Sequence, residues 1–199
     1  MILIEKTELP DEALPVAALR AHLRLGTGLG EESLQADVLG GFLRAAMAAI
    51  EARTGKVLLE RQFLLTLQDW RDPVGQPLPV APVTALNAVV MKDLDGQERT
   101  IAPALYRLVP DAQRPLLRPV AALLPMVPTG GGVQIDFSAG LAAAWPGLPA
   151  DLRQAVLMLA AHYYEYRDDT ALGAGCMPFG VSSLIERYRT VRLLGGGVA

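Results

Sequence analysis

The sequence holds few of the residues from which metal sites and disulfides are built. There is one cysteine, Cys176, and there are two histidines, His22 and His162, among 199 residues. A single cysteine excludes an internal disulfide and a metal site with several cysteine ligands. The fold must therefore be stabilised by its hydrophobic core, and the chain is long enough to bury the core of one domain.

The sequence also lacks a net positive charge and long apolar runs. The formal net charge is -3, so no overall basic field draws the chain onto phosphates, which argues against generic nucleic-acid binding. The longest apolar run, 155–161, is far shorter than the roughly 20 residues of a membrane span. The start, "MILIEKTELPDE", has neither the basic region nor the apolar stretch of a signal peptide. We expect no membrane association and a location in the cytoplasm.

Aromatic residues make up only 6% of a chain that is 51% hydrophobic, so the core must consist mainly of leucine, valine and alanine. Apolar residues at three- and four-residue steps predict a helix before the glycine-rich "GTGLG" and a longer helix over 31–54. The same pattern predicts helices over 149–166 and 179–194. The last five residues, 195–199, are expected to form a flexible tail.

The middle third of the chain has a different pattern. Apolar and polar residues alternate in "RQFLLTLQDW", "VTALNAVVMK", "ALYRLV" and "VQIDFSAG", as is typical of strands. Asp95-Gly96 predicts a tight turn between two of them. Ten prolines between positions 73 and 128 indicate short strands joined by long loops.

The predicted fold is therefore α+β, a predominantly helical bundle with a small antiparallel β-sheet inserted in the middle third. We expect a single domain over 1–199 without internal repeats. Its helical parts span 14–55 and 149–194, and its β-rich insertion spans about 57–140.

The predicted helix over 149–166 carries the cluster "HYYEY". On a helix His162 lies beside Glu165 and Tyr166. A zinc-protease helix would need a second histidine four residues away, and there is none. We interpret His162, Tyr163 and Tyr166 as packing residues, in the core or against another subunit. The alternative is a small metal-dependent or serine hydrolase that uses His162 and Glu165, with His22 or a serine gathered beside them.

Other candidate motifs are better explained as turns and helix ends. "GTGLG" and "TGK" lack the lysine-serine or the upstream glycine of a phosphate-binding loop. "DLDG" lacks the closing glutamate of a calcium loop, and no Gly-x-Ser-x-Gly is present. We therefore predict no catalytic, cofactor-binding or metal-binding residue.

The final predicted helix combines an apolar stripe with a basic flank. The stripe is formed by Leu184, Ile185, Tyr188, Val191 and Leu194, and the flank by Arg187, Arg189 and Arg192. Tyrosine and arginine are favoured at binding hot spots, so this helix suits a protein partner. Packing against the chain's own core fits the pattern equally well. A third reading is a DNA-binding accessory protein whose three arginines grip phosphate.

Six stretches follow one another along the chain. They are "LRAHLRL", "AAMAAIEARTGKVLLERQFLLTLQDW", "LPVAPVTALNAV" leading to "DLDGQ", "VQIDFSAGL", "LPADLRQAVLMLAAHYYEYRDD" and "MPFGVSSLIERYR". In this order they resemble the head-tail connector (adaptor) proteins of tailed phages, from about Ala18 to Arg189. The alanine-, glycine- and arginine-rich composition also suits a domesticated phage cluster such as a gene transfer agent.

The resemblance implies a structural protein and not an enzyme, without cofactors. Such adaptors assemble as a ring, a dodecamer in the particle, between the portal and the stopper, and DNA passes through them without sequence-specific binding. The location implied is the host cytoplasm during assembly and then the neck of the virion or gene-transfer-agent particle. The carboxy-terminal segment of the family engages the portal. The portal-binding residues implied here are Phe179, Leu184, Ile185, Arg187, Tyr188, Arg189 and Arg192.

Overall fold

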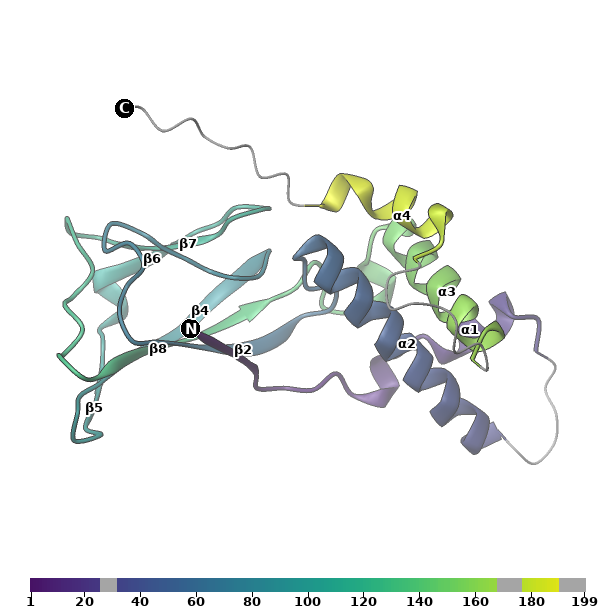
Figure 1. Cartoon of the computed structure of the whole chain (residues 1–199), viewed down its shortest axis with the longest axis horizontal. Coiled ribbons are helices and arrows are strands. Elements are labelled where there is room, and N and C mark those ends of the chain that lie inside the picture. Colours follow the sequence, from purple (N-terminus) through teal and green to yellow (C-terminus); the bar gives the residue numbers. More distant parts are fainter. Residues whose placement is uncertain (26–31, 168–176, 190–199) are drawn as a thin grey trace.

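Helices gather at one end of the molecule and strands at the other (Figure 1). The computed structural model describes residues 1–25, 32–167 and 177–189. The helices are α1 (Val16–His22), α2 (Glu32–Thr54), α3 (Ala150–Glu165) and α4 (Phe179–Ile185). Short 3₁₀ helices are η1 (Asp11–Ala13), η2 (Pro103–Leu105), η3 (Trp145–Gly147) and η4 (Glu186–Tyr188). Among the described residues, no helix has the length and apolar character that crossing a bilayer requires.

The strands of the described ranges form two antiparallel sheets, ordered β1-β2-β8-β4-β5 and β3-β7-β6. The larger sheet contains β1 (Ile2–Glu5), β2 (Arg61–Leu67), β4 (Val83–Lys92), β5 (Glu98–Thr100) and β8 (Gly132–Ala139). The smaller sheet contains β3 (Gln76–Pro77), β6 (Tyr106–Val109) and β7 (Leu116–Pro119). The last strand in the sequence, β8, thus lies at the centre of the larger sheet.

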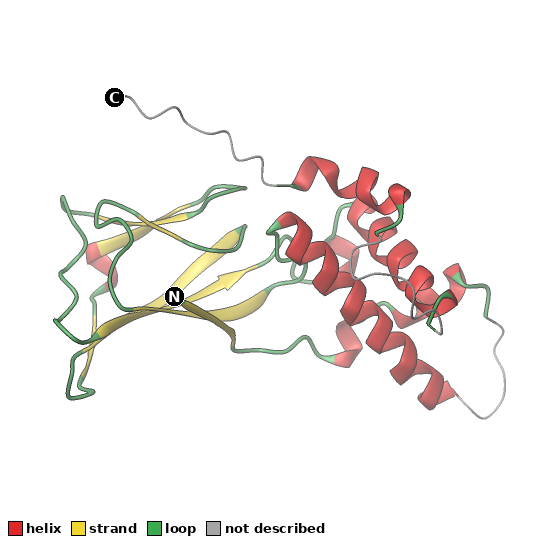
Figure 2. Cartoon of the chain, viewed as in Figure 1, coloured by secondary structure: helices red, strands yellow, loops and turns green. Residues whose placement is uncertain are grey.

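The prediction of a predominantly helical bundle with a small inserted sheet is wrong. Among the described residues, a five-stranded and a three-stranded antiparallel sheet fill one whole end of the molecule (Figure 2). Five strands, β1, β3, β5, β6 and β7, are only two to four residues long, and of these only β6 lies in a stretch whose alternation predicted a strand. β1 also comes from the amino terminus, where Ile2 pairs with Thr66 of β2. The fold is α+β, with a helical end and a β end of comparable weight.

The helical end has its own hydrophobic core, formed where α2 packs against α3, and α3 against α4. Its largest fully buried side chains are Leu19, Leu39, Leu43, Ile50, Leu58, Leu59, Leu152 and Leu159. Burying one such side chain contributes about 1.5–3 kcal/mol. The helices predicted over 31–54 and 149–166 are confirmed as α2 and α3.

The end of α2 shows why the "TGK" motif terminates a helix. The Thr54 hydroxyl donates a hydrogen bond to the Ile50 carbonyl (2.8 Å) and accepts one from the Lys56 amide (3.2 Å). Gly55 has a φ of 69°, a left-handed conformation that glycine adopts without steric cost. The interpretation of this motif as a helix end is confirmed.

The β end has a second core beneath β8. Val133, Ile135, Phe137 and Ala139 of this strand are fully buried, in the alternation that its sequence predicts. The ring of Phe137 stacks on that of Phe63, with centroids 5.7 Å apart. Leu117 and Tyr106 of the smaller sheet belong to the same core. The two sheets therefore share one apolar interior, separate from the core of the helical end.

Segment 56–60 and the chain after β8 join the two ends. The Leu141 amide donates a hydrogen bond to Val57, and the Glu60 amide donates one to Ala142. Gly140, directly after β8, lies so close to Glu60 that a Cβ on Gly140 would stand 2.4 Å from the Glu60 Cα. Only glycine fits this crossing without moving the backbone.

An ion-pair network ties both ends at this junction. Arg61, the first residue of β2, donates hydrogen bonds to both carboxylate oxygens of Glu51 in α2 at 2.6 Å. It also bonds Glu5 of β1 at 3.1 Å, and Glu51 accepts a further bond from the Leu58 amide. The side chains of Arg61 and Glu51 are only 14% and 19% exposed, so solvent screens this pair weakly.

Candidate functional site

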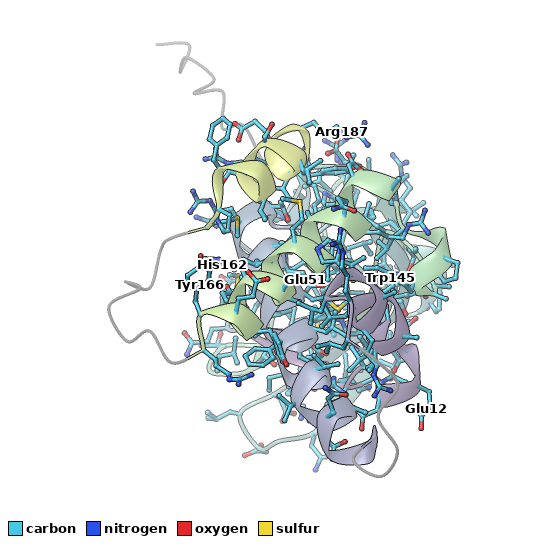
Figure 3. All side chains as sticks on the ribbon, turned by 90° about the vertical axis from the view of Figure 1, so that its right-hand side faces the viewer. Glu12, Glu51, Trp145, His162, Tyr166 and Arg187 are labelled. Atoms are coloured by element: carbon cyan, nitrogen blue, oxygen red, sulfur yellow. The ribbon has the colours of Figure 1, made fainter. Side chains whose placement is uncertain are left out.

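The aromatic end of α3 holds the histidine of the "HYYEY" cluster. The half-buried His162 ring lies 4.7 Å from the Tyr166 ring and 6.3 Å from the Tyr163 ring, measured between centroids. Figure 3 shows His162 and Tyr166 side by side, away from Arg187. Tyr163 packs against the helical core, and its burial raises the pKa of its hydroxyl. Tyr166, in contrast, is 49% exposed.

Tyr164 is a packing residue that the sequence interpretation did not single out. Its ring meets Phe42 of α2 edge-on, with centroids 6.0 Å apart, and the Arg167 guanidinium lies 5.0 Å from its centroid. Consecutive helical residues point in different directions, so Tyr163 and Tyr164 reach different neighbours. The apolar residues on more than one side of the helix were the signal for such packing.

The aromatic end of α3 shows no hydrolytic constellation within the described ranges. No group of three or more His, Cys, Asp or Glu side chains there could hold a metal ion. Of the serines considered, Ser138 lies in β8, where the Asn87 amide contacts its hydroxyl at 3.3 Å, and Ser182 and Ser183 lie in α4. Covalent catalysis needs a nucleophile within hydrogen-bonding reach of its base, whereas His162 has rings as its neighbours. Cys176 and "GTGLG" lie outside the described residues.

The carboxy-terminal segment packs on α3 along its apolar stripe. Val181 and Ile185 are fully buried, and Leu184 and Tyr188 lie half-buried against the same core. Gly180 permits a close approach, since a Cβ there would meet the terminal methyl carbon of Met158 at 2.9 Å. Ile185, named as a portal-binding residue, is thus enclosed by the chain itself.

The predicted helix over 179–194 is shorter in the structure. It ends at Ile185, continues as η4 and becomes extended at Arg189. Val191, Arg192 and Leu194 lie outside the described residues.

A polar cluster fixes the end of this segment to the start of α3. The Arg187 guanidinium pairs with Asp151 at 2.7 Å and lies 4.7 Å from the Tyr188 ring centroid. The Tyr188 hydroxyl donates a hydrogen bond to Asp151 at 2.9 Å and accepts one from Arg187. Partial burial raises the pKa of Tyr188 above its usual value. The cluster therefore holds η4 in one position against α3.

Phe179 is the apolar side chain that this segment presents to solvent. It stands at the first position of α4 and is 89% exposed, although a phenyl ring gains free energy from burial. Arg187 and Arg189 are also exposed, and Arg189 pairs with Glu186 at 3.0 Å. Phe179 stands at the start of the segment and the two arginines at its end, and aromatic side chains and arginines are both enriched at protein interfaces.

A second surface, which sequence reasoning missed, lies on the outer face of the smaller sheet. We call it the arginine cleft. It is a hollow of about 370 Å³ lined by Arg71, Asp72, Val74, Gly75, Pro77, Arg114, Leu116 and Arg118. Its arginines come from separate loops and strands, so no local sequence motif predicts that they lie together.

The chain is similar to solved structures of particle components. One is a chain from the "Neck of empty GTA particle computed with C6 symmetry", with 54% identity and a TM-score of 0.89 over 98% of this chain and 99% of that one. Another, from the "Virion of native gene transfer agent (GTA) particle", has 54% identity and a TM-score of 0.86 over the same shares. A third, from the "Neck of native GTA particle computed with C12 symmetry", has 51% identity and a TM-score of 0.83, again over 98% and 99%. No family model matches the sequence, and no curated protein matches it.

Proposed function

The chain belongs to the family of neck proteins of gene transfer agent particles, and on that premise we propose that it is the head-tail adaptor of such a particle. In this role it forms a ring in the neck, binds the portal on one side and the stopper on the other, and extends the DNA channel. The observation that carries the proposal is the identity of 54% and 51% with chains of two particle necks, over 98% of this chain.

The symmetry of the related necks supports a ring of identical copies. They were computed with C6 and C12 symmetry, and a dodecamer is compatible with both. A ring of identical subunits needs two different complementary surfaces on each copy, because every subunit contacts its two neighbours head to tail. The acidic chain, with a net charge of -3, suits a channel through which DNA slides without being held.

The carboxy-terminal segment is the portal-binding element in this proposal. Phe179, at the start of α4, is its exposed anchor, and the exposed Arg187 and Arg189 lie at the other end of the segment. Ile185 and Tyr188 contribute to binding indirectly, because they hold the segment in place on α3. The binding energy then comes from burying a large ring on a surface that is already ordered.

The charges of the segment favour a protein partner over DNA. Arg187 pairs with Asp151, and Arg189 pairs with Glu186. Each carboxylate offsets much of the positive charge that would attract a phosphate. A DNA-gripping segment would instead present unpaired basic side chains.

The proposal is tested by mixing the full chain with the portal and stopper proteins of the same particle, followed by electron microscopy. We expect ring density from this chain on the portal. Phe179→Ala should weaken portal binding by about 30-fold or more, as loss of a hot spot of about 2 kcal/mol implies. Isothermal titration calorimetry with the assembled portal measures the effect.

Met126→Ala is the matched control, since Met126 is also 89% exposed but lies at the β end. It should leave portal affinity within about twofold of the wild type. The proposal is overturned if the wild-type chain stays unbound beside an assembled portal. Equal losses for both variants would remove Phe179 from its role as anchor.

A further inference from the structure

The arginine cleft carries an unusual concentration of positive charge for an acidic chain. In the register of β6 and β7, Arg107 lies directly opposite Arg118, so both side chains point from the same outer face. Arg71 and Arg114 flank this pair in the loops beside β3 and β7, and all four arginines are exposed. Like charges that face each other across two strands destabilise a sheet. The arrangement is therefore costly for the isolated chain.

Within the described ranges, no carboxylate forms an ion pair with any of these four arginines. The two nearby aspartates bind backbone groups instead. Asp72 accepts a hydrogen bond from the Val74 amide at 2.9 Å. Asp111 accepts bonds from the Arg114 and Gln113 amides at 2.6 Å, and these bonds lower the pKa of its carboxyl. Asp72 offsets part of the charge of the cleft, and the three arginines that line it leave a net positive charge for an outside partner.

The floor of the cleft is apolar. Val74, Pro77 and Leu116 line it between the arginines, and Val74 is 52% exposed. Its volume of about 370 Å³ lies within the usual range of roughly 300–1,000 Å³ for binding pockets. A fitting ligand therefore combines a carboxylate with an apolar side chain. A bare phosphate backbone supplies only the charge.

The tip of the β4–β5 hairpin has this chemistry. Leu94 is 76% exposed and stands between Asp93 and Asp95. Gly96, with a φ of 80°, closes the turn, and the Gln97 amide donates to the Asp93 carboxylate at 2.8 Å. Asp95 is exposed, and no hydrogen bond or ion pair occupies its carboxylate within the described ranges. The turn is thus a preformed knob with an apolar apex and a free negative charge.

The hairpin and the cleft lie on opposite edges of the β end. In Figure 1 the β4–β5 turn forms the lower edge, whereas β6 and β7 lie along the upper edge. The knob of one copy therefore cannot enter the cleft of that same copy. Two complementary surfaces on opposite edges are what a head-to-tail ring contact requires.

We propose that the arginine cleft of one copy receives the Asp93–Glu98 hairpin tip of the next copy, with Leu94 on the apolar floor and Asp95 against Arg114 and Arg118. This contact deepens the proposed adaptor function and rests on it, because it is the link between neighbours in the ring. This single contact provides a binding partner both for the exposed arginines of the cleft and for the exposed Leu94.

Disulfide trapping on the portal tests the contact. In a Cys176→Ser background, one protein carries Asp95→Cys and a second carries Arg118→Cys. The two are mixed with the assembled portal and oxidised. We expect a covalent dimer from the mixture and none from either protein alone, because the bond joins two different copies. A pair of Asp95→Cys with Arg53→Cys is the control, since Arg53 is exposed at the carboxy-terminal end of α2 and does not line the cleft, so it should give no dimer.

A charge exchange provides a second, independent test. Arg118→Glu alone should lower the number of copies retained per portal by at least tenfold at limiting concentration. Combining it with Asp95→Arg should restore most of that loss, because the pair is reversed and not removed. Native mass spectrometry counts the copies, and Arg53→Glu is the matched charge reversal that should change nothing.

The outcomes separate this contact from the adaptor role. Complete rings without a trapped dimer and without sensitivity to Arg118→Glu would overturn the contact and leave the adaptor standing. Absence of any ring from the wild-type chain would overturn both. If Arg118→Glu instead abolishes salt-dependent binding of a 30-base-pair duplex while rings still form, the cleft binds DNA and the contact is refuted.

Discussion

The helical end and the β end differ in how completely they cover their own apolar and charged side chains. Among the described residues, the exposed large hydrophobic side chains of the helical end are those of Val38, Tyr166 and Phe179. The described strands, loops and amino terminus of the β end expose Met1, Ile2, Ile4, Val74, Leu94, Leu105, Val120, Leu123 and Met126. The arginines of the cleft add unpaired charge to the same end. Single exposed apolar residues are common on protein surfaces, so it is the arginine cleft, with its apolar floor, that distinguishes the β end as an interaction surface.

The difference follows from how each end satisfies its backbone. A helix completes its hydrogen bonds within itself and needs only one apolar stripe to be covered. Strands bond to neighbours, and edge strands such as β1 and β5 leave polar groups on their outer sides. The long loops between the short strands also carry side chains that belong to neither hydrophobic core. The helical end is suited to a fixed scaffold and the β end to contact with other subunits.

The largest expected effect comes from a cavity substitution in the core of the β end, with the unfolding of both ends measured. Phe137→Ala should lower the free energy of unfolding by about 3–5 kcal/mol, because a fully buried ring is replaced by a cavity. The junction joins the two ends, so we expect both to unfold in one transition. In a Trp145→Phe background, fluorescence of Trp70 reports on the β core and far-UV circular dichroism on the helices. Non-coincident urea transitions would show that the two ends are independent units.

A smaller effect is expected at the ion pair that joins the ends. Glu51→Ala leaves Arg61 without its closest partner and the Leu58 amide without an acceptor, so it should cost roughly 2–3 kcal/mol. Arg44→Ala is the control, because the Arg44–Asp11 pair is exposed and should be worth about 0–1 kcal/mol. Chemical denaturation measures both values. Equal costs would mean that the junction contributes no more than a surface pair.

Two glycines, one in the helical end and one at the junction, should change the stability in opposite directions. Gly41 lies in α2 with nothing within 4 Å of its Cβ position, so Gly41→Ala should stabilise by about 0.5–1 kcal/mol. Gly140→Ala should destabilise by about 1–3 kcal/mol, since its Cβ would overlap the Glu60 backbone. Thermal melting ranks the two variants. A stabilising Gly140→Ala would mean that the crossing at the junction relaxes without cost.

Much of the fold could be predicted from local patterns. α2 and α3 have long apolar stripes and begin and end within a residue or two of their predicted positions. β2, β4 and β8 have enough alternating residues to be recognised, and Gly96 forms the predicted turn. The number of strands in the β end could not be predicted, because β1, β3 and β7 are strands only through their hydrogen bonds to neighbouring strands.

The candidate surfaces were predictable only where their residues are neighbours in the sequence. The carboxy-terminal segment was found because its stripe and its arginines lie within a few turns of chain. The pattern could not tell that Ile185 packs inward and Phe179 outward, because both are apolar positions of one short helix. The arginine cleft was missed because Arg71, Arg114 and Arg118 come together only when β3 pairs with β7.

The sequence by itself determined the helices, the longer strands and the absence of cysteine-rich chemistry, since each depends on residues a few positions apart. The tertiary structure alone decided which apolar residues are enclosed and which face outward. It also decided that β1 pairs with β2, which lies far from it along the chain, and that the arginines share one face. Those properties arise from pairings across long stretches of chain, where the burial of many side chains together outweighs any local preference.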